Sequence, residues 1–95
     1  MLNVIIERRI MPGLEEEYEN AARSAMHASL GASGFIGGET LVALERADQR
    51  LMVTRWRDER AWKAWYTSEA RATAMQRILP LLCEEETVRL YQSAR

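Results

Sequence analysis

Residues 51–68 combine a strand pattern with a helix pattern that follows at once, and they hold all three tryptophans of the chain. The first six residues of this stretch favour a strand, whereas Trp62, Trp65 and Tyr66 recur at helical spacing on one face. Asp58 stands between the two patterns and can accept hydrogen bonds from the first amides of a helix. The chain therefore places its largest side chains on one short strand-helix unit, which constrains where a core can form.

The start of the chain predicts a strand followed by a helix. Residues 2–10 alternate between two faces, as a half-buried strand does. The apolar residues on one face are Leu2, Val4, Ile6 and Ile10. Pro12 and Gly13 set a turn, and a run of glutamates then favours the first turn of a helix, where negative charge complements the helix dipole. This helix is expected to end near Gly31, a natural C-terminal cap residue.

Later patterns complete an order of βαββαβ. The predicted elements are strands over 34–44, 51–56 and 87–91, a helix with 62–66 in its first part, and a helical segment from Ser68 to about Leu82, stopped or bent near Pro80. The order indicates an α+β, ferredoxin-like antiparallel sheet with helices on one face. Apolar residues occupy both parities of the strands, so we expect the uncovered face to meet a second sheet. Gly37 and Gly38 favour a bulge, or else a close approach of another group.

Composition narrows the class of protein. With 95 residues, 47% hydrophobic and 28% charged, the chain predicts one globular domain over 1–95. A net charge of −1 argues against nucleic acid or an anionic membrane as partner. One cysteine, Cys83, and one histidine, His27, give neither an internal disulfide nor a zinc or Cys-His site, so no metal site is expected. Charges at 7–9 interrupt any signal-peptide core, and the expected location is the cytoplasm.

Two polar features are interpreted as structural. His27 lies on the predicted helix face opposite its apolar stripe and is expected to be solvated. The run Glu84-Glu85-Glu86 is expected to be an exposed approach to the last strand, since consecutive residues of an extended chain point to alternate sides and make a poor metal site.

The stretch from Trp56 to Ser68, a strand ending in Trp, a polar cap and an aromatic-x-x-Trp-x-x-Ser helix, resembles the antibiotic biosynthesis monooxygenase (ABM) family. Met11-Pro12-Gly13 resembles the family's turn after the first strand, and Gly34-Phe35-Ile36-Gly37 resembles its entry into the second. The likeness spans about residues 2 to 92. It implies a dimeric α+β barrel, hence a homodimer, with a cavity between sheet and helices.

The resemblance also suggests several chemistries for that cavity. Some members oxidise polycyclic phenols to quinones with molecular oxygen and no metal or flavin, others bind and degrade haem, and many have no assigned reaction. The haem-degrading branch has a histidine ten residues after the matching Trp65 and an asparagine within a Glu-Asn-Arg sequence on its first strand. This chain has Met75 and Glu7-Arg8-Arg9 at these places, so haem degradation is not expected.

The quinone-forming branch has an asparagine four residues before the Trp, and here Ala61 stands at that position. The resemblance nevertheless makes Trp65, with its neighbour Tyr66, the candidate catalytic pair. The other expected cavity residues are Trp62, Met75, Arg55 and Tyr18. Core packing alone is the expected role of Trp56 and Trp62, and Trp62 is kept as a candidate cavity residue beside that role. Arg71 and Tyr91 are further polar groups that the fold could bring to the cavity.

The function predicted from these features is a cofactor-independent monooxygenase that oxidises an aromatic or quinol-like small molecule with O2. An alternative is a non-catalytic module of the same fold that binds an apolar ligand or serves in dimerisation, as the missing asparagine and histidine favour. An isomerase or decarboxylase of this architecture is a third reading, because fold alone does not decide between them.

Overall fold

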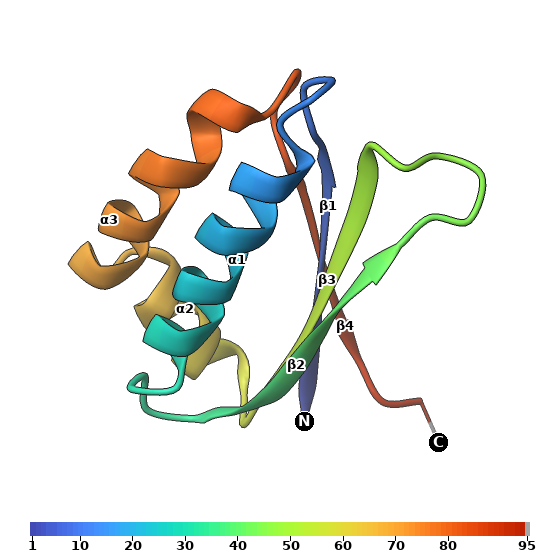
Figure 1. The fold of residues 1–95 in the computed structure, drawn as a ribbon. Coiled ribbons are helices and arrows are strands. Elements are labelled where there is room, and N and C mark those ends of the chain that lie inside the picture. Colours follow the sequence, from blue (N-terminus) through green and yellow to red (C-terminus); the bar gives the residue numbers. More distant parts are fainter. Residues whose placement is uncertain (95) are drawn as a thin grey trace.

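The computed structural model describes residues 1–94, and residue 95, the last of the predicted domain, lies outside the described part. The elements are β1 (Leu2–Arg9), α1 (Glu15–Ser29), β2 (Phe35–Val42), β3 (Gln49–Trp56), α2 (Glu59–Tyr66), α3 (Glu69–Ile78), a short 3-10 helix η1 (Leu79–Leu81) and β4 (Thr87–Gln92). The strands form one antiparallel sheet in the order β2-β3-β1-β4, and the α-helices cover one of its faces (Figure 1). The predicted ferredoxin-like α+β fold is confirmed.

The two central strands, β1 and β3, fix which residues face the helices. Both strands alternate strictly between buried and half-buried positions, as period-2 geometry requires. Their register sets Leu2 opposite Trp56 and Ile6 opposite Met52, so these side chains share the helix-covered face. The register continues to Arg9 opposite Gln49, and β3 therefore starts two residues before its predicted position.

Gly37 and Gly38 in β2 are associated with both predicted features, a bulge in the strand and the close approach of another group. The pairing of β2 with β3 shifts between Phe35 and Gly37, which confirms the bulge. A Cβ on Gly38 would lie 2.9 Å from the carbonyl oxygen of Val53 and 3.2 Å from Cε of Met26. The absence of a side chain at Gly38 therefore allows α1 to lie close to this edge of the sheet.

Local signals set the ends of the helices after β3. The Asp58 carboxylate accepts a hydrogen bond from the Ala61 amide at 2.9 Å and caps α2. The Ser68 hydroxyl accepts one from the Arg71 amide at 3.1 Å and caps α3, so the predicted second helical segment begins where expected. The helical path changes to η1 at Leu79, and Pro80 lies within that turn.

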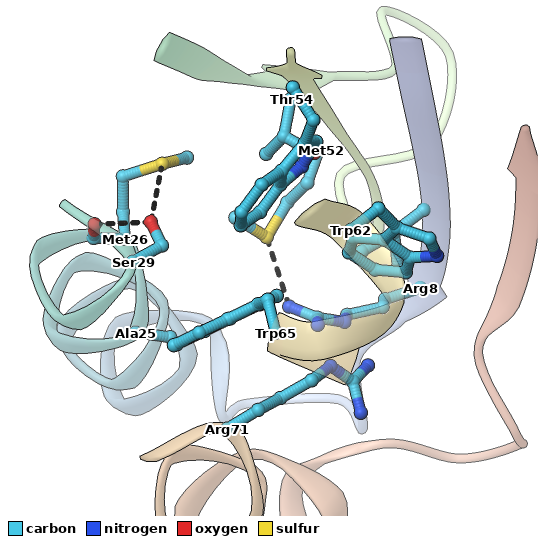
Figure 2. A pocket seen from close by; sticks show the side chains of 11 residues that line it. Arg8, Ala25, Met26, Ser29, Met52, Thr54, Trp62, Trp65 and Arg71 are labelled. Atoms are coloured by element: carbon cyan, nitrogen blue, oxygen red, sulfur yellow. Dashed lines mark hydrogen bonds between the residues drawn. The ribbon is translucent and has the colours of Figure 1, made fainter. Parts of the chain in front are cut away.

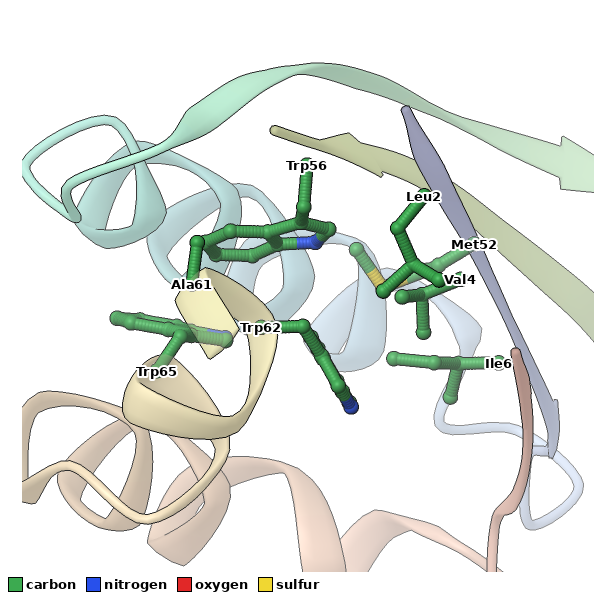
Figure 3. Close-up of a cluster of buried hydrophobic side chains, with 8 residues drawn as sticks. All are labelled: Leu2, Val4, Ile6, Met52, Trp56, Ala61, Trp62 and Trp65. Atoms are coloured by element: carbon green, nitrogen blue, oxygen red, sulfur yellow. The ribbon is translucent and has the colours of Figure 1, made fainter. Parts of the chain in front are cut away.

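The core consists of two clusters between the sheet and the helices. The first surrounds Trp56, which is fully buried and has its ring centroid 5.7 Å from Trp62 and 6.2 Å from Trp65 (Figure 3). Its members are Leu2, Val4, Ile6, Met52, Trp56, Ala61, Trp62 and Trp65. The second cluster joins α1 to α3 and comprises Ile10, Tyr18, Ala21, Ala22, Met75 and Ile78. Trp56 and Trp62 thus pack in the core, and packing is not their only role, since both also line a cavity described below.

No helix of residues 1–94 lies on the opposite face of the sheet (Figure 1). Apolar side chains occupy part of this face in every strand, and Leu41 and Tyr91 are 42% and 52% exposed. The apolar residues of this face are Ile5, Leu41, Leu51, Val53 and Tyr91. Within residues 1–94, the helices are too short or too polar to cross a membrane.

Candidate functional site

A cavity of about 30 Å³ lies between the sheet and the helices, beside all three tryptophans (Figure 2). We call it the inner cavity. Its lining is Ile6, Arg8, Ala25, Met26, Ser29, Met52, Thr54, Trp56, Trp62, Trp65 and Arg71. Most of these groups are apolar, and the only charged ones among them are two arginines. The inner cavity is therefore an aromatic-walled space with a cationic edge.

Arg8 supplies one of these cations from the buried face of β1. It is 4% exposed and lies in phase with Ile6 and Ile10, because side chains two apart on a strand share a face. Its Nε donates to a carboxylate oxygen of Glu86 at 2.8 Å, and its Nη1 donates to the Tyr18 hydroxyl at 3.1 Å. The sequence interpretation did not include Arg8 in the site, although the alternation that selects Leu2, Val4, Ile6 and Ile10 also points position 8 inward.

Glu86 joins Arg8 to Arg71. Its two carboxylate oxygens lie 2.8 Å from Nε of Arg8 and 2.6 Å from Nη2 of Arg71, and its side chain is only 13% exposed. The expected exposed run Glu84-Glu85-Glu86 is therefore corrected at its last member, which turns inward to the two cations. Glu84 fits the expectation, since its side chain is 57% exposed and pairs with Arg9 at the surface.

The capped helix α2 directs Trp62 and Trp65 inward. Both side chains are buried and both line the inner cavity, Trp65 with its ring stacked on Trp56 at an interplanar angle of 28°. Trp56 donates its indole N–H to the Thr54 hydroxyl at 3.0 Å, which fixes the central ring of the group. Figure 2 shows Trp62, Trp65, Arg8 and Arg71 around one space, whose lining all four share.

Tyr66 does not share this space with Trp65. It is 47% exposed and faces a surface groove of about 390 Å³, here called the outer groove. The outer groove is lined by Tyr66, Arg71, Met75, Leu79, Glu85, Glu86 and Val88. The Arg71 guanidinium lies 4.5 Å from the Tyr66 ring centroid, within the range of a cation-π contact. Arg71 lines both spaces, so the outer groove meets the inner cavity at this residue.

Met75 and Tyr18 lie next to Arg8 and outside the lining of the inner cavity. Both are buried, and the Met75 sulfur lies 3.6 Å from Nη2 of Arg8. Of the predicted cavity residues, Trp62 and Trp65 therefore lie in the lining of the inner cavity, whereas Met75 and Tyr18 contact Arg8 from outside that lining.

Arg55 is the predicted cavity residue that the structure moves elsewhere. In β3 the buried, helix-facing positions are those of Thr54 and Trp56, so the intervening Arg55 points to the helix-free face. Its pairing with Asn3 and Gly37 places it among residues of that face. The prediction that Arg55 lines the cavity is corrected by this parity.

The Asp58 carboxyl at the start of α2 has a shifted pKa. The Ala61 amide, and after it the Arg57 guanidinium, hold the pKa of the Asp58 carboxyl below its ordinary value, as expected for a helix cap. His27 is exposed on α1, as expected. Residues 1–94 contain no group of three or more His, Cys, Asp or Glu placed to hold a metal ion. The groups that the lining of the inner cavity offers to a ligand are the guanidinium groups of two arginines, the indole rings of the tryptophans and the hydroxyls of Ser29 and Thr54.

Comparison with known proteins agrees with this architecture. Residues 1–77 match the family model described as antibiotic biosynthesis monooxygenase. No protein with a curated description matches the chain.

Solved structures reproduce the fold at low sequence identity. A conserved protein from Methanosarcina mazei Go1 is 19% identical with a TM-score of 0.90, and the match covers 98% of this chain and 92% of that one. A structure described as an antibiotic biosynthesis monooxygenase is 17% identical with a TM-score of 0.89, and the match covers 100% of both chains. A mutant of SnoaB, a cofactor-independent oxygenase from Streptomyces nogalater, is 13% identical with a TM-score of 0.86, covering 99% of this chain and 95% of that one.

The family model covers well over half of the 95 residues, including β1 with Arg8 and the whole strand-helix unit that carries the tryptophans. The chain belongs to the antibiotic biosynthesis monooxygenase family.

Proposed function

We propose that this protein is a monooxygenase that oxidises an aromatic or quinol-like small molecule with O2 and uses no metal or organic cofactor. The observation that carries the proposal is the inner cavity, in which three indole rings and two arginine side chains meet in a chain of this family. SnoaB, which shares the fold, is described as a cofactor-independent oxygenase, and this supports the reaction type.

The proposed reaction draws its electrons from the substrate. An activated ring CH2 group loses two hydrogens and gains one atom of O2 as a carbonyl oxygen, while the other oxygen atom leaves as water. The protein must then orient the ring, favour its anionic form and exclude bulk water. Trp65 serves as a wall of the site, and Tyr66 contacts the substrate from the outer groove beside Arg71.

The assembly and location in this proposal are a homodimer in the cytoplasm, with residues 1–95 as one domain. The apolar helix-free face of the sheet supports the dimer, because it is the surface that a second copy would cover.

Oxygen uptake tests the proposal. Purified protein is supplied with anthrones and hydroquinones, and wild type is compared with Trp65→Phe and Tyr66→Phe. We expect substrate-dependent uptake that falls in Trp65→Phe by about tenfold in kcat/KM, which equals about 1.4 kcal/mol of transition-state stabilisation. The matched control is Tyr91→Phe, which alters an exposed tyrosine on the opposite face of the sheet.

The rival function is a binding module without turnover, and one observation favours it. The family's asparagine position holds Ala61, which is buried in the first core cluster and brings no hydrogen-bonding side chain. A binding module would show saturable quenching of tryptophan fluorescence by the same compounds and no oxygen uptake. That pair of results would replace the oxygenase proposal for these substrates.

A further inference from the structure

Arg8 is a buried cation whose donors are only partly matched by strong acceptors. A guanidinium carries five N–H donors, and a thioether sulfur is a weak acceptor. Arg8 makes strong hydrogen bonds to Glu86 and Tyr18, but its other two contacts are to the sulfurs of Met52 at 3.0 Å and Met75 at 3.6 Å. Buried polar groups normally find full partners, so Arg8 has capacity for a stronger acceptor in the inner cavity that it lines.

The charges around the inner cavity do not cancel. Arg8 and Arg71 share the single carboxylate of Glu86, so two positive charges meet one negative charge. The remaining lining residues of the inner cavity are uncharged. An unpaired charge is costly at low dielectric, and an anion in the inner cavity would offset that cost.

Arg50 shows that this imbalance is particular to the Arg8 site. It is the residue of β3 directly opposite Arg8, it is 6% exposed, and it also lies on the helix-covered face. Glu19 is its own carboxylate partner at 2.8 Å, and the carbonyl oxygen of Ala47 accepts a further bond. Arg50 and Glu19 thus form a neutral ion pair outside the lining of the inner cavity. Arg50 is therefore a matched control for substitutions of Arg8.

Volume limits what the anion can be. A cavity of about 30 Å³ admits a group of one or two heavy atoms, whereas a cavity that holds benzene measures about 150 Å³. The outer groove is about 390 Å³ and shares Arg71 with the inner cavity, so it is the space for a ring. The two spaces, which share Arg71, therefore suit a ring in the outer groove and a small anion in the adjoining inner cavity.

We propose that the inner cavity is a binding site for a small monoanion, held by Arg8 and Arg71, and that its occupant in the oxygenase reaction is superoxide. This second part rests on the proposed function. The deprotonated substrate in the outer groove loses one electron, and O2 in the inner cavity gains it. The resulting substrate radical and superoxide combine where the two spaces meet at Arg71, which forms the carbon–oxygen bond of a peroxide anion. After protonation, the O–O bond of this peroxide breaks, and the outer oxygen leaves as water with the remaining hydrogen of that carbon, so the carbonyl remains. Fixed cations placed where this charge develops stabilise it without reorganisation.

Bromide tests the anion site without any substrate. All three tryptophans line the inner cavity and are buried, so a bromide ion bound there quenches their fluorescence in a saturable way. Titrations are made at constant ionic strength with sulfate, which is too large for the cavity. Arg8→Met is expected to weaken bromide binding by at least about tenfold, or about 1.4 kcal/mol. Arg50→Met is expected to keep the wild-type affinity.

Arg71→Met is the second variant. The Arg71 side chain lies at the edge of the site, so this substitution leaves the buried residue Arg8 on β1 unchanged. It is expected to weaken bromide binding in the same direction. Thermal melts establish that each variant is folded. An anomalous diffraction peak of bromide between Arg8 and Arg71 would support the site directly. Absence of saturable quenching in the wild type, or equal affinity in Arg8→Met and Arg50→Met, would overturn the proposal.

The superoxide assignment has its own readout. In Arg8→Met we expect the KM for O2 to rise and kcat to fall, while the affinity for the aromatic compound stays within about twofold. If a variant no longer binds bromide but keeps the wild-type KM for O2 and kcat, the assignment of superoxide to the inner cavity is wrong. Bromide binding in a protein that oxidises no substrate would keep the anion site and reject the oxygenase function, so the two failures are distinguishable.

Discussion

Gly34 is a residue at which backbone conformation and packing act together. It has a φ of +86°, and a Cβ added there would lie 2.5 Å from Cβ of Ala61 on α2. Gly34→Ala is therefore expected to lower the free energy of unfolding by about 2 kcal/mol or more, since it combines a left-handed strain with a collision in the core. Urea denaturation followed by circular dichroism measures the loss.

The matched control for Gly34 is Gly31→Ala, three residues earlier in the same loop. The nearest atom to its added Cβ is the Ala28 carbonyl oxygen at an ordinary 3.6 Å. We expect its effect to stay within about 0.5 kcal/mol, as for most surface substitutions. Equal destabilisation by the two substitutions would show that the contact with Ala61 is not the cause.

Arg8 and Arg55 show how far single residues could be assigned from the sequence. The alternation of a strand places Arg8 on the same sheet face as Ile6 and Ile10, and it places Arg55 on the face away from Trp56. The sequence pattern was therefore sufficient to predict which face of the sheet each of the two arginine side chains occupies. The pattern was not sufficient to predict the carboxylate partner of Arg8. Glu86 lies 78 residues away in the sequence and comes close because β4, which follows it, pairs with β1. The charge balance of the site therefore depends on tertiary contacts that no local pattern contains.

At the scale of the element, the caps of α2 and α3 predict a difference in acid stability. The Ala61 amide, followed by Arg57, holds the pKa of Asp58 below its ordinary value, so the charged cap favours the folded state. This contribution is complete above the unfolded pKa of about 3.9 and is lost as the pH falls through the lower folded pKa. Asp58→Asn is thus expected to lower Tm at neutral pH and to flatten the fall of Tm below about pH 4.

Ser68→Ala is the control for the titration of Asp58. The Ser68 hydroxyl caps α3 through the Arg71 amide and carries no charge, so its loss should lower Tm equally at every pH. Melting curves from pH 2 to pH 7 compare the two variants with the wild type. If Tm of Asp58→Asn falls with pH in the same way as Tm of the wild type, the role assigned to the Asp58 carboxylate is contradicted.

Local signals also explain why the elements were predictable and their ends less so. Asp58 and Ser68 each mark a helix start through a contact three residues along the chain, and both starts were found. The start of β3 was placed at Leu51, where its run of strand-favouring residues begins, so the polar residues Gln49 and Arg50 were left out of the strand. Pairing with Arg9 and Arg8 extends the strand over both residues, and this pairing is a long-range effect.

The whole molecule has one covered and one uncovered sheet face, and this asymmetry predicts its assembly. Ile5 and Val53 lie opposite each other on the two central strands, at the middle of the helix-free face. An apolar sheet face of this kind is stabilised by packing on a second sheet, and a stable interface buries about 1,200–2,000 Å² in total. We therefore expect the wild type to sediment with twice the mass of the 10.9 kDa chain.

Val53→Lys places a charge at the centre of that face and is expected to shift the protein to a monomer, because an unpaired buried cation opposes association. Leu30→Lys is the matched control, since Leu30 is 65% exposed and follows α1 on the helix side. Sedimentation equilibrium gives the mass of each variant. A monomeric wild type, or a Val53→Lys variant that remains dimeric, would assign the pairing surface elsewhere. A shift in Val53→Lys alone would place the second copy on the helix-free face and leave the outer groove open to ligand.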